Sequence, residues 1–354
     1  MVLDDILNIA VERRASDVHL AVGATPLMRL NGELVSSGEE LLTAEELREM
    51  CSGILDEKNL AILAEEGQVD FAYRNDSARF RVNVFMDRKG MAVACRVIGS
   101  KIPSFQELGL PPVMKSFSKL RKGLVLVTGP TGSGKSTTLA SLVDEINGKA
   151  KGHIITLEDP IEYLHEHKMS LVNQREIHQD AKGFGGALRA ALRQDPDVIL
   201  VGEMRDLDTI STAITAAETG HLVLSTLHTS GAAQTVDRII DVFPPHQQAQ
   251  IRLQLSMVLE GIVSQKLLPG EDGKSRVAAF EVMTGTNAVR SLIREGKAHQ
   301  LQMQIQTGSV HGMVSMDSSI HKLYRDKVIS RETAISFAED PEGMKKLIAG
   351  NTRS

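Results

Sequence analysis

The sequence predicts an α/β protein of two domains, and three observations lead to that prediction. With 354 residues, the chain is long enough to build two hydrophobic cores of ordinary size. From about Val113 onwards, short apolar runs alternate with helical patterns, as in a parallel sheet covered by helices on both faces. Before that point, apolar and polar residues alternate, as in half-buried antiparallel strands. We therefore expect an α/β domain at 1–100, a linker at 101–112, a parallel-sheet core at 113–284 and a helical C-terminal region at 285–354.

The N-terminal domain carries signals for two helices and several antiparallel strands. Residues 3–10 have their apolar side chains on one helical face, and Thr43 with Glu46 forms a capping box that starts a helix through Leu55. A strand over SDVHLAV precedes a hairpin over MRLNGELV, where the Asn-Gly pair at 31–32 suits a type I′ turn. Three more strands are predicted over VDFAYR, ARFRVNVFM and MAVACRVI, because polar and apolar residues alternate there.

The linker and the C-terminal region are indicated by their composition. The stretch KIPSFQELGLPP contains three prolines, which interrupt both helices and strands. Beyond Thr284 the pattern is helical again, apart from a glycine-interrupted connection at 296–313.

Composition argues against several classes of protein. The formal net charge is −5, whereas nucleic-acid-binding proteins usually carry a basic excess. Cys51 and Cys95 are the only cysteines, too few for a disulfide framework or a four-cysteine zinc site. The sequence shows neither a signal-peptide pattern nor an apolar run of the about 18–20 residues that a membrane helix needs. We therefore expect a cytoplasmic protein that has no transmembrane segment and does not bind nucleic acid.

The stretch GPTGSGKST matches the phosphate-loop pattern G-x-x-x-x-G-K-[ST] in full. It follows the apolar run GLVLVT and precedes a helical pattern, which is the strand–loop–helix context that a phosphate loop requires. Its glycines allow backbone N–H groups to point at the phosphates of ATP, Lys135 is expected to reach the β- and γ-phosphates, and Ser136 is expected to hold Mg²⁺. The expected ATP-binding residues of the loop are Gly129, Pro130, Thr131, Gly132, Ser133, Gly134, Lys135, Ser136 and Thr137.

Acidic residues follow the next predicted strand. In HIITLEDPIEY the strand ends at Glu158 and Asp159, and Glu162 comes closely behind. In open parallel sheets, ligands bind outside the carboxyl ends of the strands. We expect Asp159 and Glu162 to contribute to nucleotide and Mg²⁺ binding through water, and Glu158 to polarise the attacking water. The alternative is a solvated acidic turn, since acidic residues are mostly exposed.

A further buried strand, VILV, leads to Glu203 at the position of a Walker B acid. A glutamate there can orient and deprotonate water, and we expect Glu203 to take part in the Mg²⁺ site as well. Arg205 follows two residues later. It either forms an ion pair with Glu203 or contacts phosphate, and the sequence leaves both open.

Two histidines flank the strand in TGHLVLSTLHTS. His221 precedes the strand and His228 follows it, and an offset of seven residues places them on opposite faces and ends. A metal site shared by the two is therefore not expected. We interpret His228 as a γ-phosphate sensor, with a core histidine as the alternative, and His221 as structural.

Five arginines are candidates for neutralising phosphate charge. Arg189 and Arg193 are four residues apart on one predicted helix face. Arg79 and Arg81 share one strand face and Arg96 lies on the paired strand, without obvious acidic partners in the sequence. Each is either a solvated surface charge, the commoner fate of arginine, or a source of positive charge when two domains or subunits close over a nucleotide.

The order of four stretches, GPTGSGKST, LEDPIEY, RQDPDVILVGEMRD and TGHLVLSTLHT, resembles the secretion-ATPase superfamily that drives type II secretion and type IV pili. They are similar to its Walker A, Asp box, Walker B and His box. ASDVHL, GQVDF and RFRVNVF resemble its N-terminal PAS-like domain. SLIREGKAHQLQMQIQTG with GMVSMDSSI is similar to the C-terminal region of the pilus-retraction branch. The resemblance covers essentially the whole chain.

The resemblance implies a PAS-like domain followed by a RecA-like ATPase domain with a helical C-terminal region. It implies a ring of six identical subunits, seated at the cytoplasmic face of the inner membrane on the pilus platform protein. There the ring hydrolyses ATP to power pilus retraction, in which pilin is removed during twitching motility. Carried over by motif, the site residues are Glu203 as the catalytic glutamate, Glu158, Asp159 and Glu162 of the Asp box, His221 and His228 of the His box, and the phosphate-contacting Arg79, Arg81, Arg96, Arg189 and Arg193.

Three other functions compete with retraction. Assembly ATPases of the superfamily carry a four-cysteine zinc element and a longer N-terminal extension, whereas this sequence has no cysteine after Cys95. A nucleic-acid translocase needs a basic ring lining, which the net negative charge disfavours. An accessory retraction paralogue that binds ATP without turnover is disfavoured by the intact Lys135, Ser136 and Glu203.

Overall fold

The computed structural model describes residues 2–30, 32–98 and 101–350. The hairpin predicted around the Asn-Gly pair is present, because the strands on either side of it pair in antiparallel fashion. Asn31 itself lies outside the described residues, so the turn type stays a prediction.

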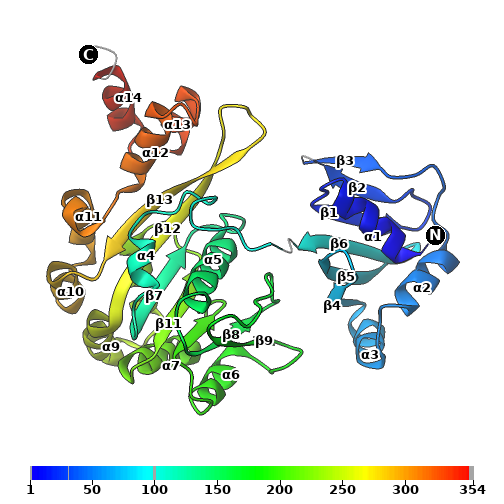
Figure 1. The fold of residues 1–354 in the computed structure, drawn as a ribbon, viewed down its shortest axis with the longest axis horizontal. Coiled ribbons are helices and arrows are strands. Elements are labelled where there is room, and N and C mark those ends of the chain that lie inside the picture. Colours follow the sequence, from blue (N-terminus) through cyan, green and yellow to red (C-terminus); the bar gives the residue numbers. More distant parts are fainter. Residues whose placement is uncertain (1, 31, 99–100, 351–354) are drawn as a thin grey trace. The chain divides into compact units, whose positions relative to one another are not determined.

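The chain divides into two compact units, which Figure 1 colours from blue to cyan and from cyan to red. The first unit comprises Met1–Lys101 together with the short segment Pro160–Leu164. The second comprises Ile102–Asp159 and His165–Ser354. Each unit is described by itself below.

The N-terminal unit is built on a six-stranded sheet with the strand order β3-β2-β1-β6-β5-β4. All neighbouring strands are antiparallel, as the alternating pattern predicted. Its elements are α1 (Leu3–Glu12), β1 (Asp17–Ala21), β2 (Leu27–Leu30), β3 (Glu33–Ser36), α2 (Ala44–Ser52), α3 (Glu57–Glu66), β4 (Gln68–Arg74), β5 (Arg79–Asp87) and β6 (Gly90–Ile98).

The capping box predicted at the start of α2 is confirmed. The Thr43 hydroxyl accepts a hydrogen bond from the Glu46 backbone N–H at 3.2 Å, and the Glu46 carboxylate accepts one from the Thr43 N–H at 2.8 Å. The expected end at Leu55 is wrong, since α2 stops at Ser52 before Gly53. A second helix that the sequence reading missed, α3, then begins where the Asp56 carboxylate caps it.

Both cysteines belong to the core of this unit. The exposed fractions of Cys51 and Cys95 are 0% and 1%. Burial raises the pKa of the Cys51 thiol to about 11 and that of the Cys95 thiol to about 12. Because the thiolate is the reactive form, we expect the native protein to resist iodoacetamide at pH 8 and the denatured protein to react at both positions. Mass spectrometry measures this, and rapid labelling of the native protein would contradict the burial.

The second unit contains a seven-stranded sheet with the order β13-β12-β7-β11-β10-β8-β9. Neighbouring strands are parallel except for β13, which is antiparallel to β12. The elements up to the end of the sheet are α4 (Met114–Phe117), β7 (Gly123–Thr128), α5 (Lys135–Asn147), β8 (His153–Glu158), β9 (Leu171–Glu176), α6 (Phe184–Ala191), β10 (Val198–Val201), α7 (Leu207–Glu218), β11 (Leu222–Leu227), α8 (Ala232–Asp241), α9 (Pro245–Val258), β12 (Leu259–Pro269) and β13 (Arg276–Thr284).

Helices cover both faces of this sheet, and the central strand β7 shows why its sequence is apolar throughout. All six residues of β7 are buried. Leu124 and Leu126 pack in the core that α6, α7, α8 and α9 share. Val125 and Val127 point to the opposite face, where they pack with α4 and α5. The α/β fold class expected from the sequence is confirmed.

The C-terminal region is helical, as predicted. It contains α10 (Asn287–Arg294), η1 (Ala298–Gln300), α11 (Leu301–Thr307), η2 (Ser309–His311), α12 (Met316–Arg325), α13 (Arg331–Phe337) and α14 (Pro341–Gly350). The stretch 296–313 is therefore not a plain connection, because Leu301 and Ile305, one helical turn apart, bury a short helix against the core. No helix in the described part of the chain is long and apolar enough to cross a membrane.

Candidate functional site

The parallel sheet brings the sequence-predicted motifs to one edge. The strands β7, β11, β10 and β8 lie side by side and run in the same direction, so their carboxyl ends meet there. The phosphate loop follows β7, and Glu158 ends β8. Glu203 comes just after β10 and His228 just after β11. This edge is the candidate nucleotide site.

The loop between β7 and α5 has the backbone of an anion cradle. Gly129, Gly132 and Gly134 have φ angles of +145°, +78° and +87°, which other residues adopt only with strain. Helix α5 begins at Lys135, whose exposed fraction is 8%. Its Nζ donates to the carbonyl oxygens of Gly129 at 2.9 Å and of Pro130 at 3.0 Å, so the ammonium group lies over the loop that is expected to hold phosphate.

The side chains of the loop fit a nucleotide and its metal ion. The Ser133 hydroxyl is buried and has no hydrogen-bond partner among the described residues, although buried polar groups are nearly always paired. A phosphate oxygen in the cradle would give it one. The Ser136 side chain, in the first turn of α5, is exposed and free to reach a metal ion beside the phosphates.

Glu203 lies at the centre of a small polar cluster. Its side chain is 18% exposed, and Oε2 is 2.8 Å from Arg205 Nε and 3.5 Å from His228 Nε2. The loop that carries it is tied to β11, because the Thr226 hydroxyl donates to the Gly202 carbonyl at 2.6 Å. The structure therefore assigns Arg205 to the ion pair, and it brings His228 to the carboxylate that the sequence had marked as the catalytic base.

The Asp-box residues differ in how free their carboxylates are. Glu158 Oε1 accepts hydrogen bonds from the Thr156 hydroxyl at 2.6 Å and from Gln174 Nε2 at 3.2 Å. Asp159 lies 3.7 Å from His178 Nε2. Glu162 is exposed, and its segment Pro160–Leu164 groups with the N-terminal unit. The hydrogen bonds to Glu158 hold one of its carboxylate oxygens against side chains of β8 and β9.

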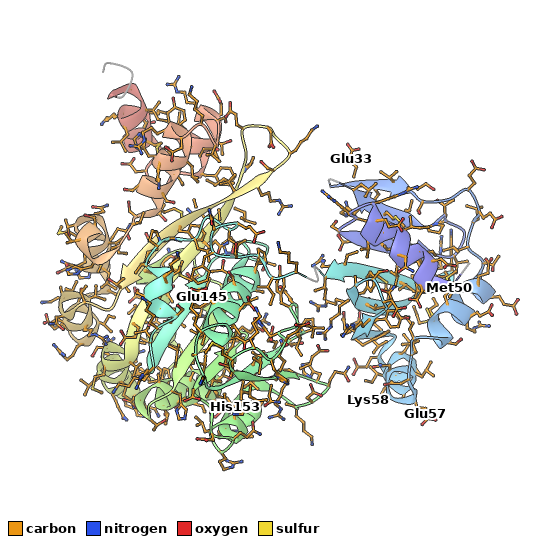
Figure 2. The ribbon with its side chains drawn as sticks, in the orientation of Figure 1. Glu33, Met50, Glu57, Lys58, Glu145 and His153 are labelled. Atoms are coloured by element: carbon orange, nitrogen blue, oxygen red, sulfur yellow. The ribbon has the colours of Figure 1, made fainter. Side chains whose placement is uncertain are left out.

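His221 lies at the other end of β11, at the amino edge of the sheet. Its Nδ1 is 2.9 Å from the Ala216 carbonyl oxygen, and six strand residues, about 20 Å, separate it from the end that carries His228. His153, labelled in Figure 2, makes a similar contact at the start of β8, where Nδ1 is 3.0 Å from the Gln194 carbonyl oxygen. The two histidines therefore lie at opposite ends of β11, as expected, and the contact of His221 with a backbone carbonyl fits its structural interpretation.

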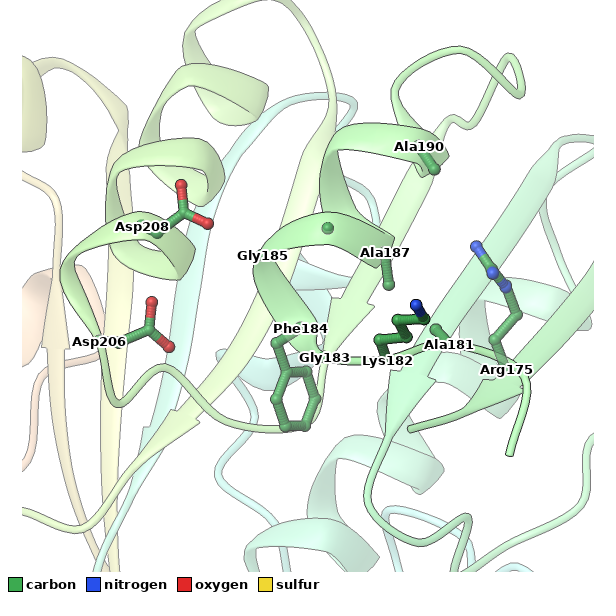
Figure 3. Close-up of a pocket in the computed structure, with 11 residues that line it drawn as sticks. Arg175, Ala181, Lys182, Gly183, Phe184, Gly185, Ala187, Ala190, Asp206 and Asp208 are labelled. Atoms are coloured by element: carbon green, nitrogen blue, oxygen red, sulfur yellow. The ribbon is translucent and has the colours of Figure 1, made fainter. Parts of the chain in front are cut away.

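Arg189 and Arg193 do not share a helix face. Helix α6 ends at Ala191, so Arg193 lies beyond it and donates back to the Arg189 carbonyl at 3.2 Å. Arg189 itself pairs with Asp208 at 2.6 Å. Asp208 also lines a pocket of about 560 Å³ around the start of α6, shown in Figure 3. None of the residues lining that pocket belongs to the phosphate loop.

The arginines of the N-terminal unit have acidic partners that the sequence reading did not find. Arg81 and Arg96 are direct neighbours on β5 and β6. Arg81 Nε lies 3.6 Å from Asp70, and Arg96 Nε lies 2.9 Å from Asp17. The carboxylates come from β4 and β1, so strand pairing brings them close to the arginines. Arg79 starts the same strand β5.

Sequence reasoning missed two polar residues on β12. Ser264 is fully buried and its hydroxyl lies 2.8 Å from the Thr128 hydroxyl at the end of β7. Gln265, the next residue, is 4% exposed. The signal was present, because these two residues and Lys266 interrupt the apolar residues of the stretch GIVSQKLL. Across residues 2–30, 32–98 and 101–350, no group of three or more His, Cys, Asp or Glu side chains is placed to hold a metal ion.

Known proteins resemble the chain over nearly its whole length. It matches the family described as "Type II/IV secretion system protein" over residues 1–350. It is 47% identical over 343 residues to the Pseudomonas aeruginosa protein named "Type IV pilus retractation ATPase PilT", covering 97% of this chain and 99% of that protein. Over 321 residues it is 47% identical to the "Twitching motility protein" of Neisseria gonorrhoeae, covering 90% and 86%. A solved structure, "Crystal Structure of the Pilus Retraction Motor PilT and Bound ADP", has a TM-score of 0.90 at 46% identity, covering 98% and 99%.

Proposed function

The chain belongs to the type II/IV secretion system protein family, and on this premise we propose that it is an ATPase motor that powers type IV pilus retraction. One observation carries the proposal. In a chain 47% identical to a named retraction ATPase, an intact phosphate loop lies at the same sheet edge as the Glu203–His228 pair. The loop supplies a place for ATP, and the pair supplies a base for a water molecule beside it.

The residues of this edge divide the work of hydrolysis. The loop N–H groups and Lys135 bind the phosphates, with the amino end of α5 adding its partial positive charge. Ser136 and Glu203 would hold Mg²⁺, which would neutralise charge on the β- and γ-phosphate oxygens. Glu203 Oε2 accepts a proton from the attacking water, and His228 Nε2, 3.5 Å from that oxygen, reports whether the γ-phosphate is present.

The ion pair between Arg205 and Glu203 must break before Glu203 can act as the base. Arg205 Nε lies 2.8 Å from Glu203 Oε2, so this oxygen is occupied by the ion pair and is not open to a water molecule. The side chain of Arg205 is 72% exposed and is therefore able to turn away. We propose that it exchanges the carboxylate for a phosphate oxygen when ATP is present, which frees Glu203 to act as the base.

The assembly and location follow from the same family membership. We propose a homohexamer that docks on the pilus platform protein at the cytoplasmic face of the inner membrane, without binding nucleic acid. The net charge of −5 supports the last point. The intact Lys135, Ser136 and Glu203 favour an active retraction motor over an accessory paralogue that binds ATP without turnover. The names of the two relatives favour a retraction ATPase over an assembly ATPase.

Steady-state ATP hydrolysis by the full-length protein tests the catalytic part of the proposal. We expect phosphate release that depends on Mg²⁺ and falls to background when EDTA removes the metal, because the triphosphate charge is then left uncompensated. Adding Mg²⁺ in excess of the EDTA is the control and should restore the rate. Equal rates with and without the metal would contradict the proposed site.

A second test concerns the arginines of the N-terminal unit, which we propose to supply charge during hydrolysis. Arg81→Ala and Arg96→Ala should each lower kcat without a matching loss of nucleotide affinity. Arg→Lys at the same positions should restore kcat only in part, because lysine lacks the planar guanidinium group that binds phosphate through two N–H groups. Arg74→Ala, at the exposed end of β4, is a matched control. Unchanged kcat in both variants would leave Arg81 and Arg96 as partners of Asp70 and Asp17 only.

A further inference from the structure

Gln265, on the strand next to the one that leads into the phosphate loop, has no role in the mechanism above. Strand β12 pairs with β7 in parallel, and Ser264 lies opposite Thr128, the last residue of β7. Gln265 comes one residue later, level with the start of the loop. Its exposed fraction is 4%. A primary amide is costly to bury unless its polar atoms are paired, so the partners of this side chain show what holds it there.

The side chain of Gln265 reaches the far end of the loop. Gln265 Oε1 accepts a hydrogen bond from the Thr138 hydroxyl at 2.7 Å, and both residues are buried. Thr138 lies in the first turn of α5, the helix that begins at Lys135. A Cβ atom added at Gly134 would lie 2.8 Å from Gln265 Nε2, so the amide packs directly against the residue that caps this helix.

The backbone of Gln265 meets the near end of the loop. Only glycine fits at position 129 for two reasons. Its φ is +145°, and a Cβ atom there would collide with the Gln265 carbonyl oxygen. The same residue therefore touches the first residue of the loop through its backbone and the residue before Lys135 through its side chain. The segment 130–133 lies between these two contacts, and the N–H groups of residues 131–133 face the phosphates in the proposed site.

We propose that Gln265 is a positioning residue that fixes both ends of the phosphate loop. The inference rests on the proposed nucleotide site and adds a residue from β12 to it. A loop with three glycines at positive φ has many conformations open to it, and holding its ends limits the entropy lost when the N–H groups converge on phosphate. A neutral amide suits this place, because a carboxylate there would lie beside the bound phosphates and repel them.

Three substitutions separate positioning from packing. Gln265→Met keeps the length of the side chain and removes both polar atoms. Gln265→Glu keeps the shape and the acceptor for Thr138 but adds negative charge. Thr138→Val removes the hydroxyl that Gln265 accepts from and leaves β12 untouched. Ser264→Ala is the matched control, since it deletes a buried hydrogen bond of similar length, to Thr128, one residue earlier on the same strand.

The measurements are ADP affinity by calorimetry and the melting temperature, both on the full-length protein. We expect Gln265→Met and Thr138→Val to weaken ADP binding by about 3- to 10-fold, the effect of one net hydrogen bond. Gln265→Glu should weaken it most, by at least about 10-fold, because like charges meet. Ser264→Ala should melt at a lower temperature and bind ADP within about 2-fold of wild type. KM for ATP should rise with ADP Kd in the Gln265 variants, while kcat changes much less.

The ADP affinities and melting temperatures of the variants, compared with one another, decide between positioning and packing. If Gln265 only fills space, both Gln265 variants behave like Ser264→Ala, with stability lost and ADP affinity kept; this result would overturn the inference. If neither Gln265 variant folds, Thr138→Val decides, and unchanged ADP affinity in that variant would overturn it as well. Absence of ADP binding by the wild-type protein would instead refute the proposed nucleotide site.

Discussion

Lys135→Ala is expected to abolish ATP turnover, lowering kcat/KM by roughly 10²-fold or more, and to weaken nucleotide binding. Lys135 is the first residue of α5, and its Nζ already lies over the loop, within 3.0 Å of the Gly129 and Pro130 carbonyl oxygens. No other ammonium group of the loop is available to compensate the β- and γ-phosphates. Phosphate release and ADP affinity measure the two effects.

A lysine just beyond the other end of the same helix, which stops at Asn147, provides the control for Lys135→Ala. Lys149 is exposed and pairs with Glu145, which Figure 2 labels, so Lys149→Ala should leave turnover unchanged. A melting curve on both variants separates lost chemistry from lost folding. Wild-type turnover in Lys135→Ala would contradict the assignment of Gly129–Thr137 as the phosphate loop.

Glu203→Gln should keep ATP binding while hydrolysis falls by roughly 10²–10⁴-fold, because the amide keeps the shape of the carboxylate and loses its basicity. Glu203 is the carboxylate that His228 and Arg205 both approach, at 3.5 and 2.8 Å. Single-turnover hydrolysis together with ATP affinity measures the effect. Glu145→Gln, a surface change on α5, is the matched control and should be neutral.

Glu158→Gln distinguishes the two candidate bases. Glu158 Oε1 already accepts from Thr156 and Gln174, so we expect a loss of only a few-fold, well short of that in Glu203→Gln. If Glu203→Gln retains turnover within a few-fold of wild type while Glu158→Gln loses it, the base lies on β8 and the proposed mechanism is wrong.

The fold and the strand ends could be predicted because the signals are local. The capping box at Thr43 and the apolar run of β7 each lie within a few neighbouring residues. The sequence also placed Glu203 and His228 correctly at strand ends, since parallel strands share a carboxyl edge.

The partners of the polar side chains could not be predicted, because strand order decides them. Asp17 reaches Arg96 through the pairing of β1 with β6, two strands that are far apart in the sequence. Gln265 reaches Thr138 because β12 pairs with β7, which no local pattern indicates. The end of α6 was also missed, since Arg193 continues the helical spacing after the helix has stopped at Ala191.

The most direct test of the account is pilus retraction observed in living cells. A strain that lacks only the gene for this chain would be complemented with the wild-type protein or with Glu203→Gln, at matched expression, and labelled pili would be followed by fluorescence microscopy. The account predicts that wild type restores retraction and that Glu203→Gln leaves pili extended. Retraction at the normal rate with Glu203→Gln, or in the strain without the gene, would contradict it.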